Sequence, residues 1–203
     1  RSRCFKILRF AQNDRELTSP VYPESHVLAH RLMVAQIGGL CYTVRDTEGC
    51  GMEWETYMTQ ALELARQAGA LGEIPVGAVI VKDGAVIGRG FNRRETDHDA
   101  TAHAEVLAIR EACRTLGGWR LDGCALFVTL EPCPMCTGAI LQSRLSRVVY
   151  GAADPKAGCC GGLLALTEEN FDTHPAIYAG VLEQECAALL RDFFAGRRRA
   201  SEK

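Results

Sequence analysis

Residues 76–91 read VGAVIVK-DG-AVIGRGF, two runs rich in valine and isoleucine that are joined by Asp83-Gly84. An Asp-Gly pair between two such runs is a strong signal for a β-hairpin, because both residue types tolerate the positive φ that the tight turn requires. The hairpin supplies two antiparallel strands of a sheet, and the segments around it decide the rest of the fold.

The segments on either side of this hairpin carry alternating helix and strand patterns. The segment before it has apolar residues at helical spacing, and those after it run helix, strand, helix, strand, strand, helix. We expect helices near 57–68, 102–116, 132–143 and 182–194 and strands near 125–130, 147–151 and 177–182, with Thr101 as the N-cap of the second helix and Pro132 beginning the third. This order predicts an α/β fold with three layers, α/β/α, around a mixed central sheet of about five strands.

The pattern changes near residue 52. Residues 1–51 show no sustained helical or alternating period and are interrupted by proline and glycine. We interpret 1–51 as an N-terminal extension that is not part of the fold, and 52–203 as one compact domain. Two explanations of the extension stay open: the native start is Met52, or the chain has a genuine extension.

Composition excludes several classes of protein. The chain is 47% apolar and 24% charged, which is ordinary for a globular protein and argues against disorder or a fibrous repeat. The formal net charge of −2 excludes a basic surface over the whole molecule, so any RNA-binding surface must be local. Ten cysteines are too sparse for a disulfide scaffold, and no run resembles a signal peptide or a membrane span. We therefore expect a cytoplasmic protein without membrane attachment.

Two short motifs bring metal-binding side chains to the starts of the second and third helices. The first is HAE at 103–105 and the second is PCPMC at 132–136. Helix N-termini in an α/β sheet meet at one crevice, so His103, Cys133 and Cys136 supply an imidazole and two thiolates to one place. These are three zinc ligands with a fourth position left for water, and Glu105 is placed to act as the adjacent base.

A structural zinc site is the alternative explanation of the same residues. It needs a fourth protein ligand, for which the candidates are His98, Cys124, Cys159 and Cys160. The combination H-x-E with P-C-x-x-C favours the catalytic explanation, because it is the signature of zinc deaminases and a structural zinc has no use for the glutamate.

Residues 54–199 resemble the bacterial tRNA-specific adenosine deaminases of the cytidine-deaminase-like superfamily. The resemblance extends over the strings EIPVGAVIV (73–81), GFNR (90–93), HDATAHAE (98–105), LFVTLEPCPMC (126–136), SRVVYGAADPKAG (146–158) and ECAALLRDFF (185–194).

This resemblance implies a cytidine-deaminase-like fold and hydrolytic conversion of adenosine to inosine, with release of ammonia, at the wobble position of a tRNA anticodon. It implies one zinc ion per subunit on His103, Cys133 and Cys136, with Glu105 moving protons. It also implies a homodimer whose two subunits contact the anticodon stem-loop. The implied substrate contacts are Asn92, the backbone N–H of Ala104, Asp154, Lys156, Phe194 and Arg198.

Purely structural roles for some of these residues stay open. Phe194 and its neighbour Phe193 are also typical core residues of an amphipathic helix, and Asp154 with Lys156 also fits an ordinary turn. The chain departs from the family at 172–174, where Asp-Thr-His stands in place of the common Asn-His-Arg. That departure removes basic and amide groups from the expected RNA surface.

Two other functions fit part of the same pattern. Guanine deaminase and other nucleobase deaminases share the zinc motifs, but a small-molecule enzyme has no need of the arginine-rich end at 197–199. A non-catalytic, zinc-bearing RNA-binding module is the alternative from another class, and Glu105 argues against it.

Overall fold

The computed structural model describes residues 5–9, 32–37, 40–46 and 51–201, and the side chains of residues 53–199. The strands are β1 (Phe5–Arg9), β2 (Leu32–Ile37), β3 (Leu40–Asp46), β4 (Gly77–Lys82), β5 (Ala85–Phe91), β6 (Ala125–Leu130), β7 (Arg147–Ala152) and β8 (Ala176–Ala179). The helices are α1 (Gly51–Ala70), α2 (Ala104–Leu116), α3 (Pro134–Gln142), α4 (Glu183–Ser201) and the short 3₁₀ helix η1 (Leu166–Glu168). None of the helices described is long and apolar enough to cross a membrane.

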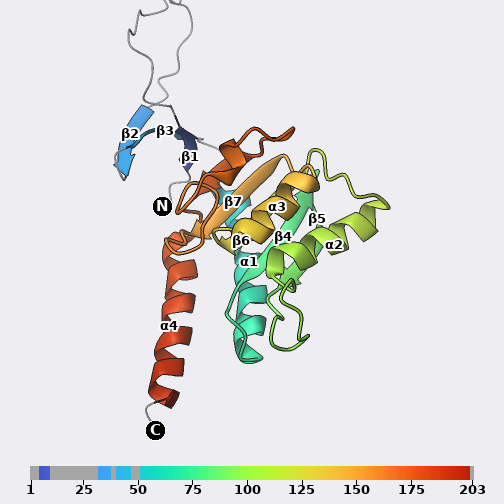
Figure 1. Ribbon diagram of the computed structural model, residues 1–203, viewed down its shortest axis with the longest axis vertical. Helices are drawn as coiled ribbons and strands as arrows, with labels where there is room; N and C mark the ends of the chain where they lie inside the picture. The colour runs from blue at the N-terminus through green and yellow to red at the C-terminus, as the bar shows by residue number, and fades with distance from the viewer. Residues whose placement is uncertain (1–4, 10–31, 38–39, 47–50, 202–203) are drawn as a thin grey trace, which may run out of the picture.

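Five strands from the part of the chain after residue 51 form a mixed sheet in the order β8-β7-β6-β4-β5 (Figure 1). The hairpin β4–β5 is antiparallel, and β4 also pairs antiparallel with β6. The next two pairs, β6–β7 and β7–β8, are parallel. The hairpin turn is where the sequence predicts it, with φ of 49° at Asp83 and 78° at Gly84. The α/β fold and the mixed sheet of five strands are therefore confirmed.

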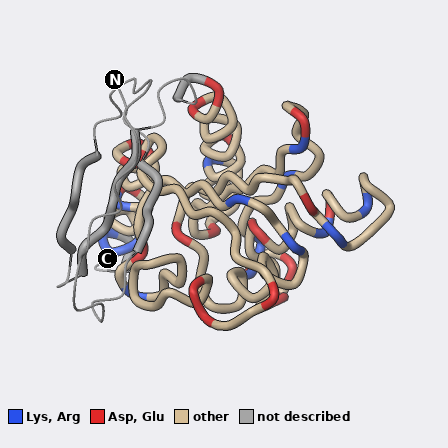
Figure 2. The backbone as a smooth tube through the Cα atoms, turned by 90° about the horizontal axis from the view of Figure 1, so that it is seen from above, with Lys and Arg blue, Asp and Glu red and all other residues tan. Residues whose placement is uncertain are grey.

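Helices cover both faces of this sheet, as Figures 1 and 2 show. Alternate residues of each strand point to opposite faces, so Ala78 and Ile80 of β4 pack with α2 and α3, whereas Val79 and Val81 pack with α1 and α4. These four side chains are at most 7% exposed. The central strands are thus buried on both sides, which explains their nearly continuous apolar sequences.

The backbone of β5 touches the first turn of α2. A Cβ atom at Gly90 would overlap the carbonyl oxygen of Ala104, so only glycine permits this approach. The contact fixes the start of α2, and with it His103, against the sheet.

Two helices begin later than their sequence predicts. The N–H and hydroxyl of Thr101 both donate to Oδ1 of Asp99, at 2.8 and 2.7 Å, so Thr101 closes a turn with Asp99 and does not cap α2. His103 is the N-cap of α2, with φ −78° and ψ 152°. In the same way Cys133 is the N-cap of α3 and Pro134, not Pro132, occupies the first turn. Both shifts place metal-binding residues themselves at the helix caps.

The N-terminal segment contributes backbone strands that its sequence does not predict. Strand β3 pairs antiparallel with both β2 and β1, and β1 continues the sheet by pairing antiparallel with β8 through Phe5–Ala179 and Lys6–Tyr178. The division into an extension and a domain at 52–203 stays a prediction, because pairing at one edge does not show that the domain needs it.

Candidate active site

Three side chains from two helix starts converge on one point. Nδ1 of His103 lies 3.7 Å from Sγ of Cys133 and 3.5 Å from Sγ of Cys136, and the ligand atoms of all three residues lie within 4.8 Å of one another. A tetrahedral zinc ion with ordinary Zn–S and Zn–N bonds separates a sulfur from a nitrogen by about 3.5 Å. The spacing of the donor atoms and their chemistry therefore both fit Zn²⁺.

The electrostatics of the cluster prepare one sulfur as an anion. A hydrogen bond from Cys136, together with those from His103 and from the backbone N–H of Cys136, lowers the pKa of Cys133 to about 4 despite partial burial. The same hydrogen bond raises the pKa of Cys136, which is buried and holds its proton. The hydrogen bond to Cys133 also raises the pKa of His103. Zinc binding therefore displaces the proton of the Cys136 thiol.

No fourth ligand joins this group among the side chains that the structure describes. The thiol of Cys159 lies 3.4 Å from the carbonyl oxygen of Ala157, and that of Cys160 lies 4.0 Å from Oγ1 of Thr137. The remaining candidates, Cys124 and His98, are also outside the group: Cys124 contacts the carbonyl of Asp122 and His98 is exposed. Three protein ligands with an open position are typical of catalytic zinc.

Glu105 lies in the first turn of α2, beside the metal cluster. Its side chain is 4% exposed, and burial, followed by the charge of Cys133, raises the pKa of its carboxyl. A buried carboxyl whose pKa is raised above the ordinary value is typical of a general acid and base.

Asn92 follows β5 and is held by a buried acid that sequence reasoning missed. Its Nδ2 donates to Oε2 of Glu73 and to the carbonyl oxygen of Ile74, both at 3.3 Å. Oε1 of Glu73 accepts hydrogen bonds from the N–H and hydroxyl of Thr96, at 2.7 and 2.8 Å. Glu73 is 1% exposed, and the only signal for it in the sequence is an acid beside the apolar run that follows Pro75.

Three further expected substrate contacts lie at the start of α2 and in the loop after β7. Ala104 is fully buried and is the first residue of α2, and because of that position its backbone N–H has no acceptor inside the helix. Asp154 and Lys156 lie in the loop after β7, where Oδ1 of Asp154 accepts from the N–H groups of Lys156 and Ala157. This contact matches the ordinary-turn explanation of Asp154, while the Lys156 side chain is exposed.

The two phenylalanines of α4 differ in their surroundings. Phe193 is partly buried and stacks edge-to-face with Phe194 at 5.4 Å between ring centroids, and the guanidinium of Arg197 lies 5.5 Å from the Phe193 ring. Phe194 is 41% exposed. The core explanation therefore fits Phe193 better than Phe194. Arg198 is exposed on the same helix, and Figure 2 shows basic residues close to the C-terminus.

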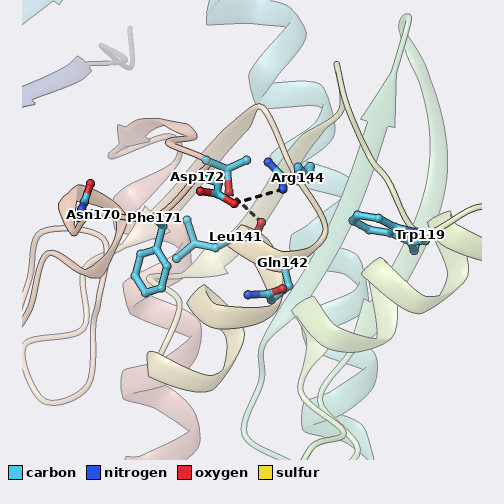
Figure 3. Close-up of a pocket in the computed structure, with 8 residues that line it drawn as sticks. Trp119, Leu141, Gln142, Arg144, Asn170, Phe171 and Asp172 are labelled. Carbon is cyan, nitrogen blue, oxygen red and sulfur yellow. Dashed lines mark hydrogen bonds and ion pairs between the residues drawn. The ribbon is translucent and has the colours of Figure 1, made fainter.

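A separate cavity of about 220 Å³ lies at the C-terminal end of α3 (Figure 3). It includes the segment at which the chain departs from the resembled family: Asp172 pairs with Arg144 at 3.7 Å and the Thr173 hydroxyl donates to the carbonyl of Leu141 at 2.9 Å. Cys133 and Cys136 lie at the other end of α3, so this cavity is not part of the metal site.

The fold and the metal site define a zinc-dependent deaminase, and comparison with known proteins agrees. Residues 52–152 match the family model of the cytidine and deoxycytidylate deaminase zinc-binding region. The chain is 52% identical over 141 residues to the tRNA-specific adenosine deaminase of Bacillus subtilis, and the matched region covers 69% of this chain and 88% of that protein. The chain belongs to the family of tRNA-specific adenosine deaminases.

Solved structures show the same fold. A structure from studies of A-to-I editing by tRNA:A34 deaminases at the wobble position of transfer RNA has a TM-score of 0.64 and 46% identity, over 66% of this chain and 99% of that one. A guanine deaminase from Nitrosomonas europaea has a TM-score of 0.58 and 28% identity, over 70% of this chain and 84% of that one.

Proposed function

We propose that this protein hydrolyses adenosine to inosine, with release of ammonia, at the wobble position of a tRNA anticodon. The observation that carries the proposal is an open three-ligand metal site beside the buried Glu105, in a chain 52% identical to a tRNA-specific adenosine deaminase. The structural neighbour associated with editing of tRNA:A34 supports the same substrate.

The roles of the residues follow from their positions. His103, Cys133 and Cys136 hold Zn²⁺, which when bound supplies Lewis-acid activation of water for attack on C6 of adenine. Glu105 accepts a proton from the attacking water, delivers it to N1 of the base and assists departure of the amine. Asn92 and the backbone N–H of Ala104 bind the flipped base.

The RNA contacts extend this site along the surface. Lys156 and Arg198 are exposed cations that can bind phosphate, and the exposed ring of Phe194 can stack on a base. An unpaired anticodon base costs little to turn out of its stack, which suits a loop adenosine as substrate.

The assembly proposed is a homodimer acting in the cytoplasm. Large apolar side chains are exposed at Leu163 (56%), Leu164 (53%) and Met135 (36%), and Met135 stands between the two cysteine ligands in the sequence. Burial of these side chains by a second subunit would bring both chains to the RNA site. The seven free cysteines of the described part suit a reducing compartment.

A parallel assay separates this proposal from its alternatives. The zinc-loaded protein is incubated with an anticodon stem-loop bearing wobble adenosine, with guanine and with cytidine, and the products are measured by mass spectrometry. We expect inosine from the stem-loop alone. A stem-loop with guanosine at the wobble position and adenosine in the stem is the matched control. Xanthine as the main product would identify a guanine deaminase, and no product from any substrate is the result expected of a non-catalytic RNA-binding module.

A further inference from the structure

Glu131 is a buried carboxylate to which the proposed reaction assigns no role. It follows β6 directly and stands two residues before Cys133, and its side chain is 2% exposed. A buried charge is costly unless hydrogen bonds compensate for the loss of water. For Glu131, the backbone N–H groups of a single loop supply these hydrogen bonds.

Both carboxylate oxygens of Glu131 accept hydrogen bonds from the loop that follows β7. Oε2 accepts from the N–H of Asp154 at 3.1 Å, and Oε1 accepts from the N–H groups of Cys160 at 3.0 Å and Gly162 at 2.8 Å. The carboxylate therefore holds the loop at its beginning and at its end.

The backbone around Glu131 strengthens the same connection. The N–H of Glu131 donates to the carbonyl of Ala152 at 2.9 Å, and the carbonyl of Pro132 accepts from the N–H of Cys159 at 2.9 Å. Four hydrogen bonds thus join the strand end that leads to Cys133 to the loop that carries Asp154 and Lys156, and a fifth joins it to the end of β7.

The loop backbone is shaped to receive this carboxylate. A Cβ atom at Gly158 or at Gly162 would overlap the carboxylate oxygens of Glu131. Glycine at both positions lets the loop close around the group, so the hydrogen bonds to charge are short and sheltered from water.

We propose that Glu131 is a positioning residue, whose carboxylate holds the 153–162 loop in register with the metal-binding start of α3 so that Lys156 faces the bound RNA. The proposal rests on the proposed function, because it treats the loop as an RNA-binding element. Glu131 contacts neither the metal ligands nor the reacting base in this scheme, and it acts through the loop.

Amide hydrogen exchange of the full chain tests the anchor directly. In Glu131→Gln the side chain keeps its shape, but its NH₂ group faces an N–H donor and the charge is lost. We expect the amides of Asp154, Cys160 and Gly162 to exchange at least ~10-fold faster, while those of β7 keep their rates. Glu73→Gln is the matched control, since it removes another buried carboxylate: it accelerates the amide of Thr96 and leaves the 153–162 loop unchanged.

Steady-state kinetics with the anticodon stem-loop test the positioning role. We expect KM of Glu131→Gln to rise about 10-fold, the equivalent of one hydrogen bond to a charged group, with kcat within about 3-fold of wild type and one zinc per chain. Gly162→Ala, which crowds the carboxylate from the loop side, gives the same rise in KM. Lys156→Ala combined with Glu131→Gln raises KM by less than the product of the single effects.

Each other result overturns the inference. A lower melting temperature with unchanged KM makes Glu131 merely structural, and loss of zinc places its action on Cys133 instead of the loop. Unchanged exchange at all three amides refutes the anchor. If the wild-type protein makes no inosine, the proposed function fails, whereas the exchange experiment still decides the anchor because it uses no substrate.

Discussion

Nδ1 of His103 lies 3.5 Å from Sγ of Cys136, although 33 residues separate them in the sequence. The reason is the position of β4, which pairs with β5 on one side and with β6 on the other. The helices that follow β5 and β6 therefore begin side by side, and each places a metal ligand at its first turn. The sheet order, more than the local sequence, creates the metal site.

Replacement of Glu105 separates chemistry from metal binding. Glu105→Ala keeps the three ligands, so we expect one zinc per chain and a fall in kcat of about 10²- to 10⁴-fold, the usual contribution of a general acid and base. Inosine formation and metal content measured on the same sample check this. Near-wild-type turnover would show that another group moves the proton.

The metal-free protein should show one unusually reactive thiol. Because the pKa of Cys133 is lowered to about 4, this residue is a thiolate at pH 6 and a thiol at pH 3. Burial raises the pKa of Cys160 and Cys186 to about 12, so both stay protonated at either pH. We expect iodoacetamide to label Cys133 first at pH 6, measured by peptide mass spectrometry.

Zinc and acid are the two controls for this labelling. Added zinc should bind the Cys133 thiolate and protect it from iodoacetamide. Lowering the pH below 4 should protonate Cys133 and abolish its labelling. Labelling that begins only above pH 8, or that zinc does not prevent, would contradict the assignment of Cys133 as the first ionised ligand.

The end of α4 should contribute to RNA affinity in two distinguishable ways. Phe194→Ala is expected to raise KM for the stem-loop by an amount equivalent to about 1–3 kcal/mol at any salt concentration, because it removes a stacking surface. Arg198→Ala is expected to raise KM at low salt and to reduce the slope of log KM against log salt by about 1, because it removes one phosphate contact.

Arg114→Ala is the matched control, since Arg114 is exposed on α2, on the other face of the sheet. It should change neither KM nor its salt dependence. If Phe194→Ala lowers the melting temperature and leaves KM unchanged, the ring belongs to the packing of α4 and not to the RNA site.

Removal of residues 1–51 tests the predicted domain boundary. Among the side chains that the structure describes, which begin at residue 53, buried clusters already cover both faces of the sheet, so we expect 52–203 to fold cooperatively and to keep its zinc. Calorimetry and metal analysis measure this. A truncated chain that aggregates or melts without a transition would show that the pairing of β1 with β8 is required.

The strands and the metal ligands could be predicted because their signals are local. The Asp83-Gly84 turn, the apolar run of β6 and the two cysteines three residues apart each lie within a short window. The N-cap of α2 could not be predicted in this way. The hydrogen bonds from Thr101 to Asp99 compete with capping by Thr101, and they do not affect the spacing of apolar residues from which the helix was predicted.

The buried acids are the larger omission. Glu131 is held by residues 23 to 31 positions away, and Glu73 by residues 19 and 23 positions away. Pairing over such distances depends on the folded topology, so nothing in the neighbouring sequence distinguishes these carboxylates from surface acids. The strands β1–β3 were missed for a different reason, since their segments have no sustained alternation of apolar and polar residues.

The contact between Gly90 and the first turn of α2 sets a limit on laboratory redesign of this enzyme. Any larger residue at position 90 must push the first turn of α2, which follows His103, away from β5. A displacement of about 1 Å at a catalytic site costs activity heavily. We therefore expect that active variants selected from random libraries will keep glycine at position 90.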